Sequence, residues 1–519
     1  MDAVWQKRLF WVLAFLLVLY RLVHLEAFIG SPHAWRQTDT AYYIYDFYQN
    51  GIDLLYPSVC WMGGHETVIF EFALPEALVA LVWKITGESI PVARLIFLSF
   101  FLFSAAYAFR LVEFLGSRKL AWWATLVYLT LPLSLYYSRA IHIDFFASAC
   151  AFAMVFHWLK GLKTKQVQQL WVGTFWAILA FLVKAPYAFV FGLPLLVFTF
   201  RENRFFYAFR RMYIFILPVV LFYGWQSHVT AVNASAPDWA YILHYRKFDD
   251  NAHWYFGTWQ QRLQLTNWLR IKTIVFRESL GWVGVLILVL GLVIRLFPSK
   301  VDKPNQQDYG WWLSMLWLGV LLYVAVFFNL NVIHEYYQIP FLLPVSMTLG
   351  WAILQLNHLT KPLKFQLLIG GGIIVLIAIE SIQYAEQHYY DLTNHEPLIE
   401  AGQILQVETE PKDLLIINYF DFDCRNPLVL YRARRRGWQL QRAAFDPPTI
   451  YRLHEEAGAS HLVLIAPTPP AGEMERFTDA MRNPPQIFPL NREPLKLYLW
   501  EIEFPSIKNP SESVSPEGQ

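Results

Sequence analysis

Residues 280–297 read LGWVGVLILVLGLVIRLF, an apolar run with a single charge, Arg295. A helix needs about 20 mostly apolar residues to cross the hydrocarbon core of a bilayer, and this run approaches that length. Ten further runs of this kind predict a polytopic α-helical membrane protein with about eleven transmembrane helices. They lie at residues 9–28, 91–113, 120–138, 144–160, 168–184, 186–200, 212–228, 310–329, 338–356 and 365–383.

The composition agrees with a membrane location. Of the 519 residues, 56% are hydrophobic and 16% are charged, whereas soluble domains carry about 25% charged residues. The 22 tryptophans suit the membrane–water boundary, where a ring is half buried and its N–H stays wet. A net charge of +2 without a basic domain offers no basis for nucleic-acid binding. The first apolar run is too long for a cleavable signal peptide and lacks a small-residue cleavage site.

The cysteines do not define the class of this protein. Cys60, Cys150 and Cys424 are too few and too scattered for a disulfide framework or a zinc site. A Cys60–Cys424 bridge stays open if both residues face an oxidising compartment.

The apolar stretch 68–86 is ambiguous because it contains Glu71, Glu76 and Lys84. Lysines and arginines in short loops favour the cytoplasmic side of a membrane. If 68–86 does not cross, all basic loop clusters share one side; if it crosses, the N-terminal cluster opposes the rest. We therefore expect a juxtamembrane helix on the outer face and a cytoplasmic N-terminus. The clusters lie within residues 7–8, 118–119, 160–165, 201–211, 295–303 and 361–364.

This orientation divides the chain into a membrane domain, residues 1–383, and a polar C-terminal part outside the membrane. The membrane domain includes two long outer segments, 29–90 and 229–279. The C-terminal part is richer in charge and proline and has runs of strand length. We expect a small soluble α/β domain over 384–504 and a disordered tail over 505–519. Its expected elements are strands at Leu414–Ile417, Leu462–Ile465 and Leu497–Trp500 and a helix at Pro447–Gly458.

The first outer segment holds residue types that group transfer needs. Residues 31–44 read SPHAWRQTDTAYYI and include Arg36 and Asp39, with Asp46 shortly after. A carboxylate here could take the proton of an acceptor hydroxyl, and an arginine could hold a phosphate. The alternative is a solvated loop in which Asp39 or its neighbour caps a helix.

Three more polar clusters stand at the outer ends of predicted spans, where ionisable residues are costly and point to function. Each has a structural alternative: a helix cap, a snorkelling lysine or an aromatic belt. All of these clusters are predicted on the same face of the membrane, which is more informative than any single cluster. The predicted orientation used only the charges of the inner loops, so it did not force the clusters onto one face. The clusters are Arg139, His142 and Asp144; Lys184 and Tyr187; and His334, Glu335, Tyr336 and Tyr337.

The order of these motifs resembles the GT-C superfamily of membrane glycosyltransferases. Within it, the chain resembles bacterial relatives of protein O-mannosyltransferases, lipid A aminoarabinose transferases and rhizobial lipopolysaccharide sugar transferases. Each motif is short, and the resemblance over most of residues 1–383 rests on their order. The motifs are Asp39 in the first outer loop, Phe70-Glu71-Phe72 before the juxtamembrane helix, Arg139-x-x-x-x-Asp144, Lys184-x-Pro186 between two spans, and His334-x-Tyr-Tyr-x-x-Pro340.

The resemblance implies an inverting transfer of a sugar from a polyprenyl-phosphate-linked donor, at the periplasmic face of a bacterial inner membrane. The implied acceptor is a glycolipid, a polysaccharide precursor or a protein, and no cofactor is required, although a divalent metal is compatible. Asp39 would be the general base on the acceptor hydroxyl.

The other implied residues bind substrate. Lys184, with Arg139 or His334, would hold the leaving lipid phosphate, and Asp144 and Glu71 would orient the acceptor or the donor sugar. The remaining implied substrate-binding residues are Arg36, His142, Tyr336 and Tyr337.

At two positions the sequence departs from the patterns of these families, so the resemblance does not identify the transferred sugar. Phe72 stands where the aminoarabinose-transferase pattern has a lysine, and Ala73 stands where a related pattern has a proline. A transporter or flippase of lipid-linked sugars is an alternative, but transporters often show repeated halves and midplane polar residues, which this sequence lacks. An assembly subunit that binds glycolipid without chemistry is a third possibility.

Overall fold

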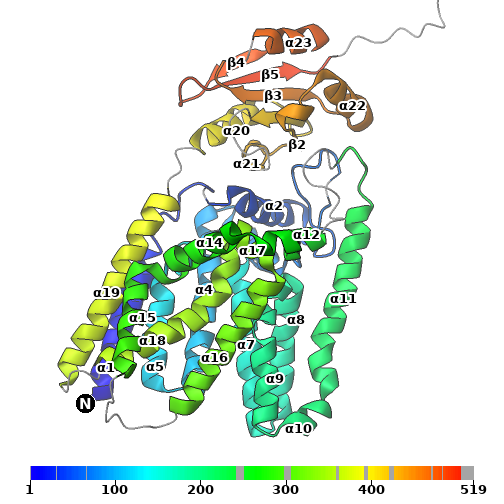
Figure 1. The fold of residues 1–519 in the computed structure, drawn as a ribbon. Coiled ribbons are helices and arrows are strands. Elements are labelled where there is room, and N and C mark those ends of the chain that lie inside the picture. The colour runs from blue at the N-terminus through cyan, green and yellow to red at the C-terminus, as the bar shows by residue number, and fades with distance from the viewer. Residues whose placement is uncertain are drawn as a thin grey trace, which may run out of the picture.

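The computed structural model contains a bundle of long helices and, at one end of it, a β-sheet with its own helices (Figure 1). The N-terminus lies at the opposite end of the bundle from the sheet (Figure 1). Two predictions involve residues outside the described part of the chain: the pairing of Cys60 with Cys424, and the tail 505–519. Cys60 itself is described and is a free, buried thiol. The structure describes residues 2–30, 32–65, 67–240, 251–296, 306–357, 362–390, 395–419, 426–468, 471–481 and 483–503.

Eight helical segments among the described residues are long and apolar enough to cross a membrane. The predicted class, a polytopic α-helical membrane protein, is confirmed, while the count of about eleven spans stays a prediction. The eight segments are Ile90–Leu115 (α4), Asp144–Thr164 (α7), Val167–Phe189 (α8), Met212–Ala234 (α11), Leu265–Ile294, Tyr309–Val326, Glu335–Asn357 and Leu363–His388 (α19).

Several segments combine consecutive elements, and further helices complete the bundle. The segment 265–294 contains α14 (Leu265–Ile274), η1 (Val275–Leu280) and most of α15 (Gly281–Leu296), and 335–357 joins η2 (Glu335–Phe341) to α18 (Leu342–Asn357). The segment 309–326 lies within α16 (Gln306–Val326). The further helices are α1 (Asp2–Tyr20), α5 (Arg118–Thr130), α6 (Pro132–Tyr137), α9 (Gly192–Arg201) and α10 (Phe205–Phe209).

The sequence suggests that two spans meet at Lys184, and the helical path is broken at this residue. The label α8 covers both sides of the break and ends at Phe189, and α9 begins at Gly192. Lys184 has non-helical dihedral angles, φ −159° and ψ 77°, so the helix kinks there and then resumes. Pro186 explains the break, because proline removes one backbone hydrogen bond of the helix.

A layer of short helices covers the sheet-facing end of the bundle (Figure 1). The stretch expected to be juxtamembrane forms α3 (Leu74–Thr86), whose 13 residues span only about 20 Å. It packs against α2 (Ala34–Asn50), which carries Asp39. The rest of this layer consists of α12 (Asn251–Phe256), α13 (Trp259–Leu263) and α17 (Phe328–Ile333).

The C-terminal part forms a five-stranded sheet of order β2-β1-β3-β5-β4. Strands β2, β1 and β3 are parallel, and α21 and α22 supply the crossovers that parallel strands require. The three predicted strands and the predicted helix are present. The elements are α20 (Glu396–Glu408), β1 (Leu414–Tyr419), α21 (Leu428–Ala433), β2 (Arg436–Gln439), η3 (Arg442–Ala444), α22 (Pro447–Ala457), β3 (His461–Ala466), α23 (Ala471–Met481), β4 (Gln486–Pro489) and β5 (Lys496–Glu501).

This sheet is attached to the outer segment of the membrane part by backbone hydrogen bonds. The N–H of Gly63 donates to the carbonyl of Gly437 in β2 at 2.8 Å, and the N–H of Gly437 donates to the carbonyl of Cys60 at 3.0 Å. A shared hydrophobic core joins α2 and α3 to α20, α21 and β1, and α20 and α21 lie between the sheet and the bundle (Figure 1).

Replacing Gly63 with alanine should weaken this attachment. Gly63 has φ 61°, where an L-residue costs about 1 kcal/mol, and its added Cβ would collide with the indole ring of Trp438. Overpacking adds about 1–3 kcal/mol. Gly458→Ala is the matched control, because Gly458 has φ 74° and open space around its Cβ position. Thermal unfolding of the purified protein should show a clearly larger loss for Gly63→Ala, and equal losses would contradict the packing.

Candidate functional site

The kink in α8 creates a docking point for the segment that precedes α3. Pro186 has no N–H, so the carbonyl of Leu182, four residues earlier, loses its helical partner. The N–H of Phe72 donates to that carbonyl at 3.3 Å. The freed backbone oxygen is thereby satisfied by the Phe70-Glu71-Phe72 motif, as buried carbonyls require.

A second contact fixes the same segment on α11. The side chain of Asn233 pairs with both backbone groups of Ile69, accepting from its N–H and donating to its carbonyl, each at 2.9 Å. Held in this way, the segment presents Glu71 to Arg36 of α2, and the two form a buried ion pair. The guanidinium of Arg36 also lies 5.4 Å from the ring centre of Phe70.

The kink also directs Lys184 toward the start of α7. Its Nζ lies 2.8 Å from Oδ1 of Asp144, and both side chains are buried. Asp144 is in the first turn of α7, where the helix dipole stabilises a carboxylate. His142 and the hydroxyl of Tyr187 contact the same carboxylate.

Three tyrosine rings surround the ammonium group of Lys184. Their centres, those of Tyr187, Tyr336 and Tyr337, lie 4.9, 4.8 and 4.3 Å from Nζ. Aromatic faces attract a cation, most strongly where water is excluded. The structure therefore brings the Arg139–Asp144, Lys184–Pro186 and His334–Pro340 motifs together at Asp144 and Lys184.

A second ion pair joins the first outer segment to η2. Nε2 of His33 lies 2.8 Å from Oε2 of Glu335, and the hydroxyl of Tyr137 donates to Oε1 at 2.6 Å. The ring of His33 meets the edge of the His334 ring at 4.6 Å between centres, and His334 stacks on Tyr336 at 5.1 Å. The contacting rings of His33, His334 and Tyr336 therefore link the start of α2 to the tyrosines that surround Lys184.

Asp39 lies within α2 and is 1% exposed. The indole Nε1 of Trp61 donates to its Oδ1 at 3.0 Å, while its buried Oδ2 has no hydrogen-bond partner among the described residues. Burial raises the pKa of Asp39 to about 7, against the lowering effects of the Arg36 charge and the Trp61 hydrogen bond. Burial also raises the pKa of Glu76 on α3. The pKa of Asp39 suits a carboxylate that accepts a proton near neutral pH.

His142 and Arg36 differ in their charge at neutral pH. Burial lowers the pKa of His142 to about 4, although Asp144 opposes the change, so its ring is neutral. Despite burial, Asp39, Glu76 and Tyr336 keep the pKa of Arg36 above its ordinary value. The permanent cation of Arg36 and the ammonium of Lys184 are thus the positive groups of this site, which we call the Asp39–Lys184 cluster.

Two predicted residues make their contacts elsewhere. Nε of Arg139 donates to the hydroxyl of Tyr390 at 3.1 Å and Nη1 donates to the carbonyl of His24 at 2.8 Å, so Arg139 faces α1 and the end of α19. Asp46 accepts from the side chain of Asn50 at 2.7 Å, one turn later in α2.

Sequence reasoning missed several members of the site. Trp61 and Tyr137 follow no motif, and only their hydrogen bonds to Asp39 and Glu335 identify them. Glu335 was visible beside His334, but nothing in the sequence linked it to His33. Within the described residues, no three His, Cys, Asp or Glu side chains are arranged to hold a metal ion.

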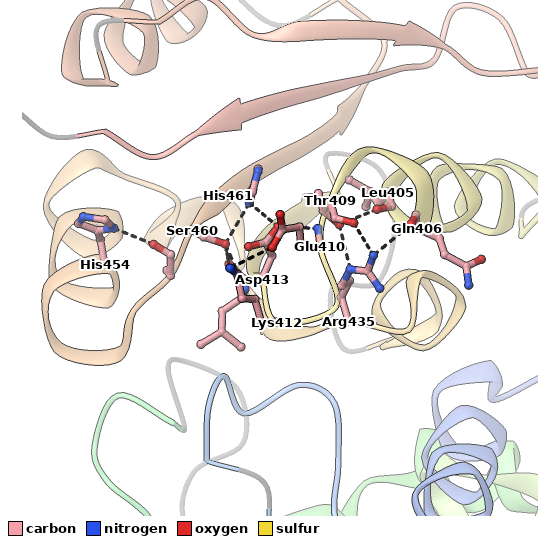
Figure 2. Close-up of polar contacts among 12 residues, drawn as sticks. Leu405, Gln406, Thr409, Glu410, Lys412, Asp413, Arg435, His454, Ser460 and His461 are labelled. Carbon is pink, nitrogen blue, oxygen red and sulfur yellow. Dashed lines mark hydrogen bonds and ion pairs between the residues drawn. The ribbon is translucent and has the colours of Figure 1, made fainter. Parts of the chain in front are cut away.

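The C-terminal sheet carries a polar cluster of its own, drawn in Figure 2. Nδ1 of His461 lies 2.9 Å from the hydroxyl of Ser460 and 3.7 Å from Oδ2 of Asp413. A catalytic triad uses the two ring nitrogens for different partners, whereas here both partners approach the same nitrogen. Arg435 donates to backbone carbonyls of Gln406 and Thr409 at the end of α20 (Figure 2). Both groups therefore stabilise the domain rather than form a reactive site.

Comparison with known proteins agrees with this architecture. Residues 74–225 match the family described as dolichyl-phosphate-mannose-protein mannosyltransferase (PMT_2). No curated protein matches the sequence. ArnT from Cupriavidus metallidurans, solved with undecaprenyl phosphate, is 11% identical and has a TM-score of 0.59, covering 94% of this chain and 97% of ArnT.

Archaeal oligosaccharyltransferase has a similar fold. The Archaeoglobus fulgidus enzyme in its apo form is 12% identical, with a TM-score of 0.52, over 88% of this chain and 69% of that chain. Oligosaccharyltransferase AglB from the same organism, in complex with an inhibitory peptide and a dolichol-phosphate, is 10% identical, also with a TM-score of 0.52, over 89% of this chain and 69% of that chain. At such identities these structures establish the fold alone. With the family match over residues 74–225, they show that the chain is similar in fold to membrane glycosyltransferases of the GT-C superfamily.

Replacing Asp144 with asparagine should destabilise the protein strongly. The change leaves the buried ammonium of Lys184 without its counter-charge, and breaking a buried ion pair on one side costs about 3–5 kcal/mol. The apparent unfolding temperature in detergent should fall accordingly.

The double variant Asp144→Asn with Lys184→Met provides the control. It removes both charges and should recover much of the lost stability. A double variant no more stable than Asp144→Asn alone would show that the two side chains do not act as a pair.

Proposed function

We propose that this chain transfers a sugar from a polyprenyl-phosphate-linked donor to an acceptor hydroxyl, with inversion at the anomeric carbon and with Asp39 as general base. The observation that carries the proposal is the Asp39–Lys184 cluster, a buried carboxylate with raised pKa that shares one site with two buried cations. A lipid-linked phosphate leaves readily, so its transfer needs one base, in-line positioning and cations for the phosphate.

The properties of Asp39 support the role of base. Its Oδ1 is fixed by Trp61, and Oδ2 is the oxygen left to accept a proton. In the proposed step the acceptor oxygen attacks the anomeric carbon while its proton passes to Oδ2. The bond between that carbon and the phosphate oxygen breaks, and the phosphate leaves with the electron pair.

Lys184 and Arg36 are proposed to stabilise the negative charge that develops on the leaving phosphate. Each is held by a carboxylate, Asp144 for Lys184 and Glu71 for Arg36, so both cations are positioned before substrate arrives. Such preorganised charges are most effective where water is excluded. The same carboxylates can accept hydrogen bonds from the sugar, and the rings of His334, Tyr336 and Tyr337 offer it a flat apolar surface.

A lipid-linked donor agrees with the place of the cluster at the sheet-facing ends of α7 and α8. The phosphate of such a donor stays at the membrane boundary while its chain remains in the bilayer. Two proteins of the same fold, ArnT and AglB, were solved with undecaprenyl phosphate and dolichol-phosphate. The proposed phosphate-binding residues differ from those of the aminoarabinose-transferase pattern, because Phe72 occupies the position of the lysine in that pattern.

We further propose that the protein is in a bacterial inner membrane with its N-terminus in the cytoplasm and its C-terminal sheet in the periplasm. The basic inner loops support this orientation. The acceptor is proposed to be a glycolipid, a polysaccharide precursor or a protein of the cell envelope, and the transferred unit a hexose or pentose.

Asp39→Asn should abolish transfer while leaving the fold intact, because asparagine keeps the shape of the side chain but cannot take a proton. General-base catalysis contributes about 10²–10⁴-fold, so kcat should fall by about that factor. The assay measures transfer from polyprenyl-phosphate sugars by purified, reconstituted protein.

Asp46→Asn is the matched control, because Asp46 is a buried carboxylate of the same helix whose Oδ1 accepts from Asn50 and not from a residue of the Asp39–Lys184 cluster. It should retain transfer. Normal transfer by Asp39→Asn would exclude Asp39 as the base. A wild-type protein that moves lipid-linked sugars across vesicles without transferring them would favour the flippase alternative.

The rate should also depend on the protonation of Asp39. Because the ionised form is active, kcat/KM should rise with pH and level off above about 7. The Trp61 hydrogen bond lowers the pKa of Asp39, so Trp61→Phe should move the midpoint to higher pH. A pH–rate profile of both proteins measures this, and a midpoint that stays fixed or moves down in Trp61→Phe would contradict the assignment.

A further inference from the structure

A second site lies outside the Asp39–Lys184 cluster, in a pocket between the loop after α1, the turn after α6 and the end of α19. It has about 380 Å³ of space, part of it open to solvent. Its polar lining comes from two arginines, a histidine, a glutamine and three tyrosines, and no carboxylate lines it among the described residues. These side chains are His24, Gln37, Arg94, Tyr136, Arg139, Tyr389 and Tyr390.

Both arginines of this pocket keep a buried N–H without an acceptor. Nη1 and Nη2 of Arg94 donate to the carbonyls of Leu25 at 2.6 Å and Phe28 at 3.2 Å, and its Nε has no acceptor among the described residues. Arg139 is 3% exposed and uses Nε and Nη1, but its buried Nη2 has no acceptor among the described residues. An unsatisfied N–H on a buried guanidinium is costly, and an anion in the pocket would satisfy it.

The charged side chains that line the pocket are arginines, and further buried positive charge lies beside it. Arg21 is completely buried behind it and donates to Ser138 and to the carbonyls of Leu17 and Leu129 rather than to an acid. The carboxylate that reaches this region, Glu386, is bound to Tyr20 and His24. Three buried arginines therefore lack a paired carboxylate among the described residues, which is unusual unless a ligand supplies the negative charge.

We propose that this pocket binds the phosphate group of an anionic membrane lipid, with Arg139 as its main contact and His24 and Tyr390 beside it. Phe28 of the pocket wall is 48% exposed, and Leu22 and Val23 in the same loop are also exposed. These apolar side chains would lie against acyl chains while the headgroup enters between the arginines. Binding here goes beyond the proposed sugar transfer and is measured without it.

The test compares ligands for the purified full-length protein in neutral detergent. Its unfolding temperature is followed with a thiol-reactive dye, which reports exposure of the buried thiols Cys60 and Cys150. The probes are phosphatidylglycerol, zwitterionic phosphatidylcholine as the lipid control, and inorganic phosphate. Phosphatidylglycerol should raise the unfolding temperature, as a ligand specific for the folded state does.

Two variants and one control locate the effect. Arg139→Gln should weaken phosphatidylglycerol binding by about tenfold or more. Ala27→Trp, which fills the pocket but keeps both arginines, should do the same. Arg118→Gln should respond as wild type, because Arg118 is an exposed arginine that begins α5.

The outcomes separate the source of the phosphate. An equal response to inorganic phosphate, lost in both pocket variants, would assign the site to soluble phosphate groups rather than to lipid. The proposal is overturned if phosphatidylglycerol and phosphate leave the wild type unchanged, or if both pocket variants respond like the wild type.

Discussion

The buried contact between Lys184 and Asp144 is the interaction on which the outer end of this molecule depends. An ammonium group inside protein requires a nearby negative charge, and only the kink at Lys184 brings Nζ to the start of α7. The same kink frees the carbonyl of Leu182, which Phe72 then occupies. One proline, Pro186, thereby determines both the place of the cation and the path of the segment that carries Glu71.

The C-terminal sheet extends this chain of contacts to Asp39. Gly437 of β2 is hydrogen bonded to Cys60 and Gly63, and Trp61 lies between these two residues in sequence. Trp61 in turn holds the carboxylate of Asp39. The sheet is therefore coupled to the proposed base through one short loop, so it has a structural role in the site although its own polar residues only stabilise the domain.

The fold could be predicted from the sequence because its main signals are local. Long apolar runs identify the membrane helices, and Leu414–Ile417 and Leu462–Ile465 lie in β1 and β3 as expected. The charges of the inner loops correctly distinguished the short helix α3 from a membrane span. The number of spans is harder to predict from the sequence, because helices such as α5 and α9 are short and depend on packing against neighbouring helices.

The site could be predicted only in part. Motif order suggested that Lys184 and Asp144 belong to one site, and they are in contact. The same reasoning grouped Arg139 with Lys184, yet Arg139 turns toward His24 and Tyr390. Contacts such as that of Trp61 with Asp39 depend on the path of a loop without periodicity, which local patterns do not encode.

The most direct test of the account is a structure of the full-length protein with undecaprenyl phosphate, determined by electron cryomicroscopy. The account predicts that the phosphate lies within about 4 Å of Lys184 Nζ and of the Arg36 guanidinium, on the side of the cluster that faces Asp39. A phosphate bound against Arg139, or away from both cations of the cluster, would contradict it.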